Sequence, residues 1–188
     1  IKDDSTVWNP GWQPCKTALD SYECRHGIGY SRFTASKNKV QASVLTFVPM
    51  NDNCELTQLK LKNTGTVEKK LSLFSYVEWC LWNADDDSRN FQRNLSTGEV
   101  EVIGSAIYHK TEYRERRNHY AVYTVNTDVD GFDTIRERFI GMYNGADKPE
   151  AVMAGKCTNS VASGWSPIAA HQIDITLAPG EEKSYVFL

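Results

Sequence analysis

The strongest fold signal in this chain is the apolar stretch from residue 71 to residue 82. Most of its odd positions are apolar, and its even positions add the aromatic side chains of Phe74, Tyr76 and Trp82. A strand that is apolar on both faces is typical of the interior of a sheet rather than its edge. We therefore expect residues 71–82 to form a central strand.

Shorter alternating segments surround this strand and predict an all-β protein. The expected strands are residues 22–33, 40–48, 56–61, 99–103, 106–109, 120–125, 173–177 and 184–188. Turn sequences such as Asn63-Thr64-Gly65 and Gly104-Ser105 separate them, and this pattern indicates an antiparallel β-sandwich. We interpret Gly27-Ile28-Gly29 as a bulge or close backbone approach within the first strand. One short helix is expected over residues 134–140, capped by Asp133 and followed by Gly141.

Composition excludes several classes of function. A net charge of −3 gives no electrostatic reason to expect nucleic acid or an anionic membrane, and no apolar run is long enough to span a bilayer. The five cysteines are scattered and never form a C-x-x-C pair, which favours reduced thiols and a cytoplasmic protein. The four histidines lack the spacing of metal ligands. Because the chain starts at Ile1 and stops within an expected strand, we expect a piece of a longer polypeptide.

The polar loop that follows the central strand is the candidate recognition site. Gln92 offers an amide donor and acceptor, and Arg93 offers a forked cation, both suited to sugar hydroxyls. Residue types alone favour a simpler interpretation, in which Arg93 pairs with the local aspartates. Asp85-Asp86-Asp87 lacks the glycine and glutamate of a calcium-binding loop. The stretch 113–117 alternates basic and acidic residues and is interpreted as a compensated surface or interface.

Several long stretches resemble one family of enzymes. They are Trp12-Gln13-Pro14 and residues 19–30, 71–78, 90–102, 108–119 and 160–167. Together they resemble the N-terminal region of the cellobiose phosphorylases of glycoside hydrolase family 94, over nearly the whole chain. The resemblance implies a super-sandwich of the galactose-mutarotase-like kind, forming one domain over residues 1–188 of a larger phosphorylase. Its helical catalytic barrel would lie outside this chain.

The resemblance also implies an activity and a partner. Such enzymes cleave cellobiose with inorganic phosphate, with inversion, to α-glucose 1-phosphate and glucose, and need no cofactor. They are homodimers in which this domain lies over the partner's active site. Gln92 and Arg93 would then bind the acceptor sugar, whereas Trp12, Tyr22 and Arg25 receive no role. We expect no catalytic residue and no metal ligand in this chain.

Two other classes of protein remain open. A free-standing carbohydrate-binding module would use exposed tryptophans as a stacking platform, although most tryptophans in a sandwich belong to its core. A mutarotase-like enzyme would need an acid and a base that meet in the concave face of the sandwich.

Overall fold

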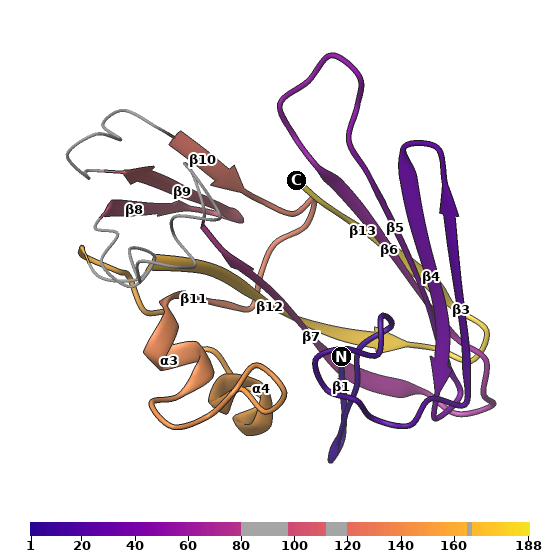
Figure 1. Ribbon diagram of the computed structural model, residues 1–188. Helices are drawn as coiled ribbons and strands as arrows, with labels where there is room; N and C mark the ends of the chain where they lie inside the picture. The colour runs from indigo at the N-terminus through magenta and orange to yellow at the C-terminus, as the bar shows by residue number, and fades with distance from the viewer. Residues whose placement is uncertain (80–97, 112–119, 165–166) are drawn as a thin grey trace. The chain divides into compact units, whose positions relative to one another are not determined.

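A computed structural model describes residues 1–79, 98–111, 120–164 and 167–188 (Figure 1). In chain order the elements are β1 (Lys2–Asp3), β2 (Thr6–Val7), β3 (Ser21–Gly27), β4 (Tyr30–Lys37), β5 (Val40–Phe47), β6 (Leu56–Asn63), β7 (Lys69–Glu78), β8 (Gly98–Ile103), β9 (Ala106–Thr111), β10 (Tyr120–Tyr123), β11 (Gly131–Ile135), α3 (Arg136–Ile140), α4 (Glu150–Ala154), β12 (Pro167–Leu177) and β13 (Glu182–Phe187). These elements belong to two compact units. The first comprises Ile1–Leu73, Val125–Thr127 and Asp174–Leu188, and the second comprises the described residues of Phe74–Thr124 and Asp128–Ile173.

The first unit is built on an antiparallel sheet with the strand order β13-β6-β5-β4-β3 (Figure 1). Cross-strand partners share a face of a sheet, so its pairing register divides the side chains between two faces. One face carries the buried side chains of Ala35, Val40, Ala42, Leu59, Leu61, Tyr185 and Phe187. The predicted alternation of residues 40–48 is confirmed at Val40 and Ala42. Val48 lies beyond the end of β5 and is 60% exposed, because the strand stops at Phe47.

The prediction of a single interrupted strand over residues 22–33 is wrong. Strands β3 and β4 are separate and antiparallel, paired from Ser21 with Ser36 to Gly27 with Tyr30. Ile28 and Gly29 form the two-residue loop between them, and Gly29 has a φ of +82°. A positive φ is typical of tight hairpin turns and costs glycine little. The two glycines therefore mark a chain reversal and not a bulge.

Strand β7 is the core of the predicted central strand. Within the first unit it lies between β12 and β1: Lys2 pairs with Ser72, and the Ser72 hydroxyl donates to Asp174 Oδ1 at 2.7 Å. Within the second unit the amide of His171 donates to Ser75 Oγ at 3.1 Å. The strand therefore has neighbours on both sides, as predicted. Residues 80–82 of the predicted strand lie outside the described part of the chain.

The second unit holds the antiparallel sheet β10-β9-β8, the pair β11-β12 and the two short helices (Figure 1). The hairpin predicted around Gly104-Ser105 is confirmed, because β8 and β9 pair from Ile103 with Ala106 to Gly98 with Thr111. The unit's core includes Ile107, Phe139, Ile140 and Ile168, each at most 1% exposed. The antiparallel all-β class expected from the sequence is thus confirmed.

The helix prediction needs two corrections. Helix α3 starts at Arg136 rather than Thr134, because Asp133 and Thr134 belong to β11; Asp133 does not cap the helix. Gly141 ends it, as predicted. A second helix, α4, was not expected; it follows Pro149 and ends at Gly155 in the left-handed conformation. No helix in the described ranges is long and apolar enough to cross a membrane.

Candidate carbohydrate-binding site

The predicted site residues Gln92 and Arg93 lie outside the described residues, as do Asp85-Asp86-Asp87 and the stretch 113–117. The residues on either side of these segments are described, and all belong to the second unit. The arrangement of these flanking residues shows which part of the second unit contains the described ends of the stretches that resemble the phosphorylase family.

The outward face of the sheet β10-β9-β8 carries a polar and aromatic surface. One row across the strands consists of Glu99, Lys110 and Tyr120. A second row, two residues further along and therefore on the same face, includes Glu101 and Tyr108. Tyr108 is 41% exposed and Tyr120 is 67% exposed. Two carboxylates, a lysine and two tyrosines thus face solvent together.

Residues 163–164 extend this surface along the edge of β8 that does not pair with β9. Gly98 and Gly164 exchange two backbone hydrogen bonds, of 3.2 and 3.1 Å, and Glu99 forms a bridge with Ser163. On the other side of β8, Gly98 pairs with Thr111. The described ends of the family-like stretches 90–102, 108–119 and 160–167 therefore meet at Gly98.

This surface is hollowed into an open cavity of about 560 Å³. Its lining consists of Glu99, Val100, Glu101, Tyr108, His109, Lys110, Tyr120, Val161, Ala162 and Ser163. The volume is within the range of small-molecule sites, and the lining mixes apolar surface with convergent polar groups. Carboxylates, hydroxyls and an ammonium group suit the many hydroxyls of a sugar, and tyrosine rings suit its C–H face.

His109 forms the support beneath this surface. It is 2% exposed, and its ring stacks on Trp79 with centroids 5.4 Å apart. Burial lowers the pKa of His109, and a backbone hydrogen bond with Glu99 only partly offsets this effect, so the imidazole is neutral at pH 7. A β-carbon at Gly98 would lie 2.3 Å from His109 Cε1. Glycine is therefore required at the residue where the three stretches meet.

The segment 158–164 is fixed in place by Asp133 and Thr134 of β11. The fully buried Asp133 carboxylate accepts hydrogen bonds from the amides and hydroxyls of Thr158 and Ser160. Thr134 Oγ1 donates to the carbonyl of Ser160 and accepts from the amide of Ala162 at 2.7 Å. These bonds orient the chain immediately before Ser163 and Gly164, which complete the site.

A second set of contacts fixes the end of β7, which leads towards the site. Glu78 Oε1 accepts from the hydroxyl of Tyr76 and from Nε of Arg136 on α3, the latter at 3.0 Å. The Tyr76 ring stacks on Phe139 with centroids 5.1 Å apart. Burial opposes the charge of Arg136, but hydrogen bonding and electrostatic attraction to Glu78 and Tyr76 together outweigh it and raise the pKa of Arg136, which keeps the guanidinium charged.

Sequence reasoning missed the residues that form this surface. Tyr108, Tyr120 and the two glutamates were parts of predicted strands or matching stretches and received no individual role. Their signal is the strand period: polar or aromatic side chains at every second position on β8 and β9 share one face. The register that brings Tyr120 beside Lys110 cannot be derived from that period alone.

The fold and this surface define a class: an antiparallel β domain with an exposed polar and aromatic surface. A family model described as "Glycosyl hydrolase 94, supersandwich domain" matches residues 1–188. The chain belongs to that family, as its sequence motifs predicted.

Its curated relatives include phosphorylases that differ in substrate. The chain is 30% identical to N,N'-diacetylchitobiose phosphorylase of Vibrio proteolyticus, over 100% of the chain and 24% of that protein. It is 30% identical to solabiose phosphorylase of Paenibacillus borealis, over 98% and 24%. It is 31% identical to 3-O-beta-D-glucopyranosyl-beta-D-glucuronide phosphorylase of the same species, over 97% and 24%. The chain spans about a quarter of these relatives.

Proposed function

We propose that this chain is the N-terminal domain of an inverting disaccharide phosphorylase, with cellobiose as its disaccharide. The enzyme would convert cellobiose and inorganic phosphate to α-glucose 1-phosphate and glucose, without a cofactor. The chemistry would take place in a catalytic domain outside this chain, and this domain would bind the acceptor sugar. The family membership and the phosphorylase relatives support the reaction class.

The observation that carries the binding role is the meeting of three family-like stretches at Gly98. Gln92 and Arg93 precede Gly98 in the chain by six and five residues, so their tether to this surface is short. We assign them hydrogen bonds to acceptor hydroxyls. A forked guanidinium provides five donors, and a primary amide provides donors and an acceptor, which together match neighbouring hydroxyl groups.

The proposal includes a homodimer in which this surface faces the partner's catalytic site. An exposed, polar, aromatic face supports this arrangement, because tyrosine-rich surfaces are typical of binding sites shared between two partners. We also place the enzyme in the cytoplasm. The scattered cysteines support that location, and no disulfide joins the described ones, Cys15, Cys24, Cys54 and Cys157.

Phosphorolysis by the full-length enzyme tests the choice of substrate. Release of sugar 1-phosphate is measured with cellobiose, N,N'-diacetylchitobiose, solabiose and the glucosyl glucuronide under identical conditions. The proposal predicts the highest kcat/KM for cellobiose. A higher value for any of the other three would replace cellobiose by that disaccharide and leave the phosphorylase class intact.

The competing function is a carbohydrate-binding module, and the exposed Tyr108 and Tyr120 favour it. Tryptophan provides less support, since Trp8 is fully buried, although Trp12 is 43% exposed. Titration of the 188-residue chain with cellobiose separates the two functions. Micromolar binding without a catalytic domain would favour the module, and binding that appears only in the full-length dimer would favour the phosphorylase.

A further inference from the structure

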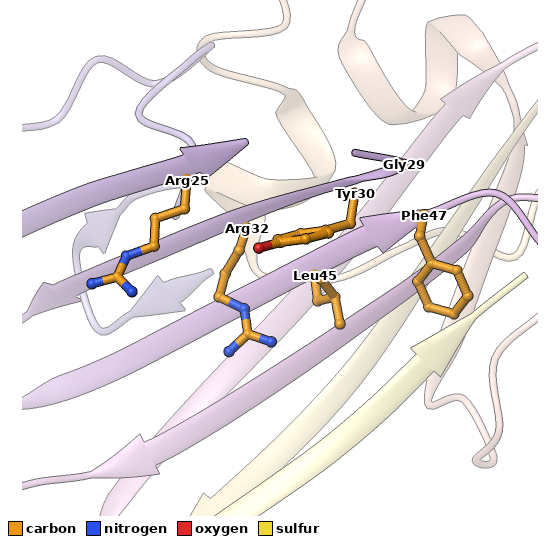
Figure 2. A pocket seen from close by; sticks show the side chains of 6 residues that line it. All are labelled: Arg25, Gly29, Tyr30, Arg32, Leu45 and Phe47. Carbon is orange, nitrogen blue, oxygen red and sulfur yellow. The ribbon is translucent and has the colours of Figure 1, made fainter. Parts of the chain in front are cut away.

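A second polar hollow lies on the solvent-facing side of the first unit's sheet. It has a volume of about 540 Å³ and is lined by Arg25, Gly29, Tyr30, Arg32, Leu45 and Phe47. Figure 2 shows the two guanidinium groups extending from neighbouring strands towards the same side, with Tyr30, Leu45 and Phe47 nearby. These residues lie in the first unit, whereas the surface around Gly98 belongs to the second.

The two arginines are direct cross-strand partners. Arg25 on β3 pairs with Arg32 on β4, and Arg32 in turn pairs with Leu45 on β5. Like charges placed opposite each other across a sheet destabilise it. A fold tolerates such a pair most readily where an anion lies between the two cations.

Within the described ranges, a carboxylate lies beside only one of these two cations. Arg25 donates to Glu23 at 2.8 Å, and both side chains are exposed, so solvent weakens this pair. Among the described residues, Arg32 forms no ion pair. A bound oxyanion would accept from the Arg32 fork and reduce the repulsion from Arg25.

The adjacent row supplies an aromatic platform. Tyr30 pairs with Gly27 on one side and with Phe47 on the other. A β-carbon at Gly27 would lie 2.1 Å from Tyr30 Cε1, so the ring lies directly over the glycine. The ring is held flat against β3, yet Tyr30 is 44% exposed. Its outer face is therefore free to pack against the C–H face of a ligand ring.

From these two rows we infer that the hollow binds an anionic monosaccharide. The sugar ring packs on Tyr30 above the apolar floor of Leu45 and Phe47, and its phosphate or carboxylate lies between Arg32 and Arg25. Either anion provides the oxygen pair that a guanidinium fork recognises. Neither unit's fold nor the proposed acceptor role of the surface around Gly98 depends on this site.

Calorimetry on the intact protein that contains this chain tests the inference by counting sites per chain. The probes are glucose 6-phosphate, glucuronate, glucose and inorganic phosphate. The variants are Arg32→Gln, Arg32→Lys and Tyr30→Ala, with Lys62→Gln as the control, because Lys62 is an exposed cation elsewhere on the same sheet. All four variants replace exposed side chains, and circular dichroism verifies that the variant proteins fold.

We expect Arg32→Gln and Tyr30→Ala to lose one anionic-sugar site per chain, while Lys62→Gln retains it. Arg32→Lys should bind about tenfold more weakly, since it keeps the charge without the fork. Binding of glucose 6-phosphate alone identifies a phosphate ligand, and binding of glucuronate alone identifies a carboxylate ligand. The inference is overturned if Arg32→Gln retains every charged-sugar site of the native protein, or if inorganic phosphate or glucose binds as tightly as the charged sugars at the site that Arg32→Gln removes.

Discussion

The Asp133 carboxylate accepts a hydrogen bond of 2.7 Å from the hydroxyl of Ser160, and the amide of Ser160 donates to the same oxygen at 3.0 Å. Asp133 is fully buried, so these bonds satisfy a charge that solvent does not reach. Ser160 precedes Gly164 by four residues, and Gly164 pairs with Gly98 at the candidate site. A buried carboxylate in β11 therefore holds one edge of the proposed sugar surface.

Replacing Asp133 should destabilise the second unit and loosen this edge. Asp133→Ala leaves the amides and hydroxyls of Thr158 and Ser160 without their acceptor, and we expect a loss of at least about 3 kcal/mol in unfolding free energy. Chemical denaturation measures the loss. The control is Asp128→Ala at an exposed aspartate, which should change stability by less than about 0.5 kcal/mol. Equal losses of unfolding free energy in the two variants would show that Asp133 does not hold this edge in place.

Adding a methyl group at Gly98 should disrupt the meeting point of the three stretches. The new β-carbon would lie 2.3 Å from the His109 ring and 2.7 Å from the carbonyl oxygen of Lys110. Since backbone cannot move aside easily, Gly98→Ala should cost about 2–3 kcal/mol in unfolding free energy.

Gly104→Ala is the matched control for this steric effect. Gly104 has a φ of +59° and no atom within 4 Å of an added β-carbon. We expect it to cost only about 1 kcal/mol, from backbone strain in the hairpin turn. If the Gly98 variant is no less stable than the Gly104 variant, the close packing against His109 is not what fixes this edge.

His171 should make the stability of the chain depend on pH. It is 1% exposed and stacks on Tyr123, and burial lowers its pKa to about 4. Its pKa in the unfolded chain is about 6.5, so the unfolded state binds the proton first as pH falls. The stabilisation from neutral His171 is present above pH 6.5 and is lost progressively towards pH 4.

The expected contribution is a loss of about 2 kcal/mol between pH 7 and pH 5. Denaturation at the two pH values measures it in the native chain and in His171→Phe, which preserves an aromatic ring beside Tyr123. The variant should lose about 2 kcal/mol less than the native chain over this interval. An identical pH dependence in both would assign the effect to other groups.

Tyr120 should contribute to acceptor binding if the surface around Gly98 faces a sugar. In the full-length enzyme, Tyr120→Ala removes the exposed ring and should raise the acceptor KM about fivefold, while Tyr120→Phe retains most of the packing. Tyr143→Ala is the control, because Tyr143 is 93% exposed and lies outside the candidate site. A similar small effect at both tyrosines would contradict a specific role for Tyr120.

The sequence allowed the strands to be predicted wherever apolar alternation met a clear turn, as at Gly104-Ser105. It was misleading at Gly27-Ile28-Gly29, because a glycine pair is compatible with either a bulge or a reversal. The position of the Tyr30 ring over Gly27 is a cross-strand contact that no local pattern contains. Similarly, Asp133 has the residue type and position of a helix cap, yet its partners lie 25 and 27 residues further along the chain.

The candidate site, too, could be predicted from the sequence only in part. The family resemblance indicated which stretches matter, and the strand period indicated which side chains alternate. What joins Gly98, Thr111 and Gly164 is strand register, which is determined by packing over the whole unit.

The most direct test of the proposed binding role is the acceptor kinetics of Arg93→Ala in the full-length enzyme. With saturating α-glucose 1-phosphate, the KM for acceptor glucose in the synthetic direction should rise by about one to two orders of magnitude. Arg93→Lys should recover part of the loss, and sedimentation should show the same oligomeric state for the variants as for the native enzyme. An unchanged KM in a folded variant of unaltered oligomeric state would contradict the claim that this domain contributes to the acceptor site.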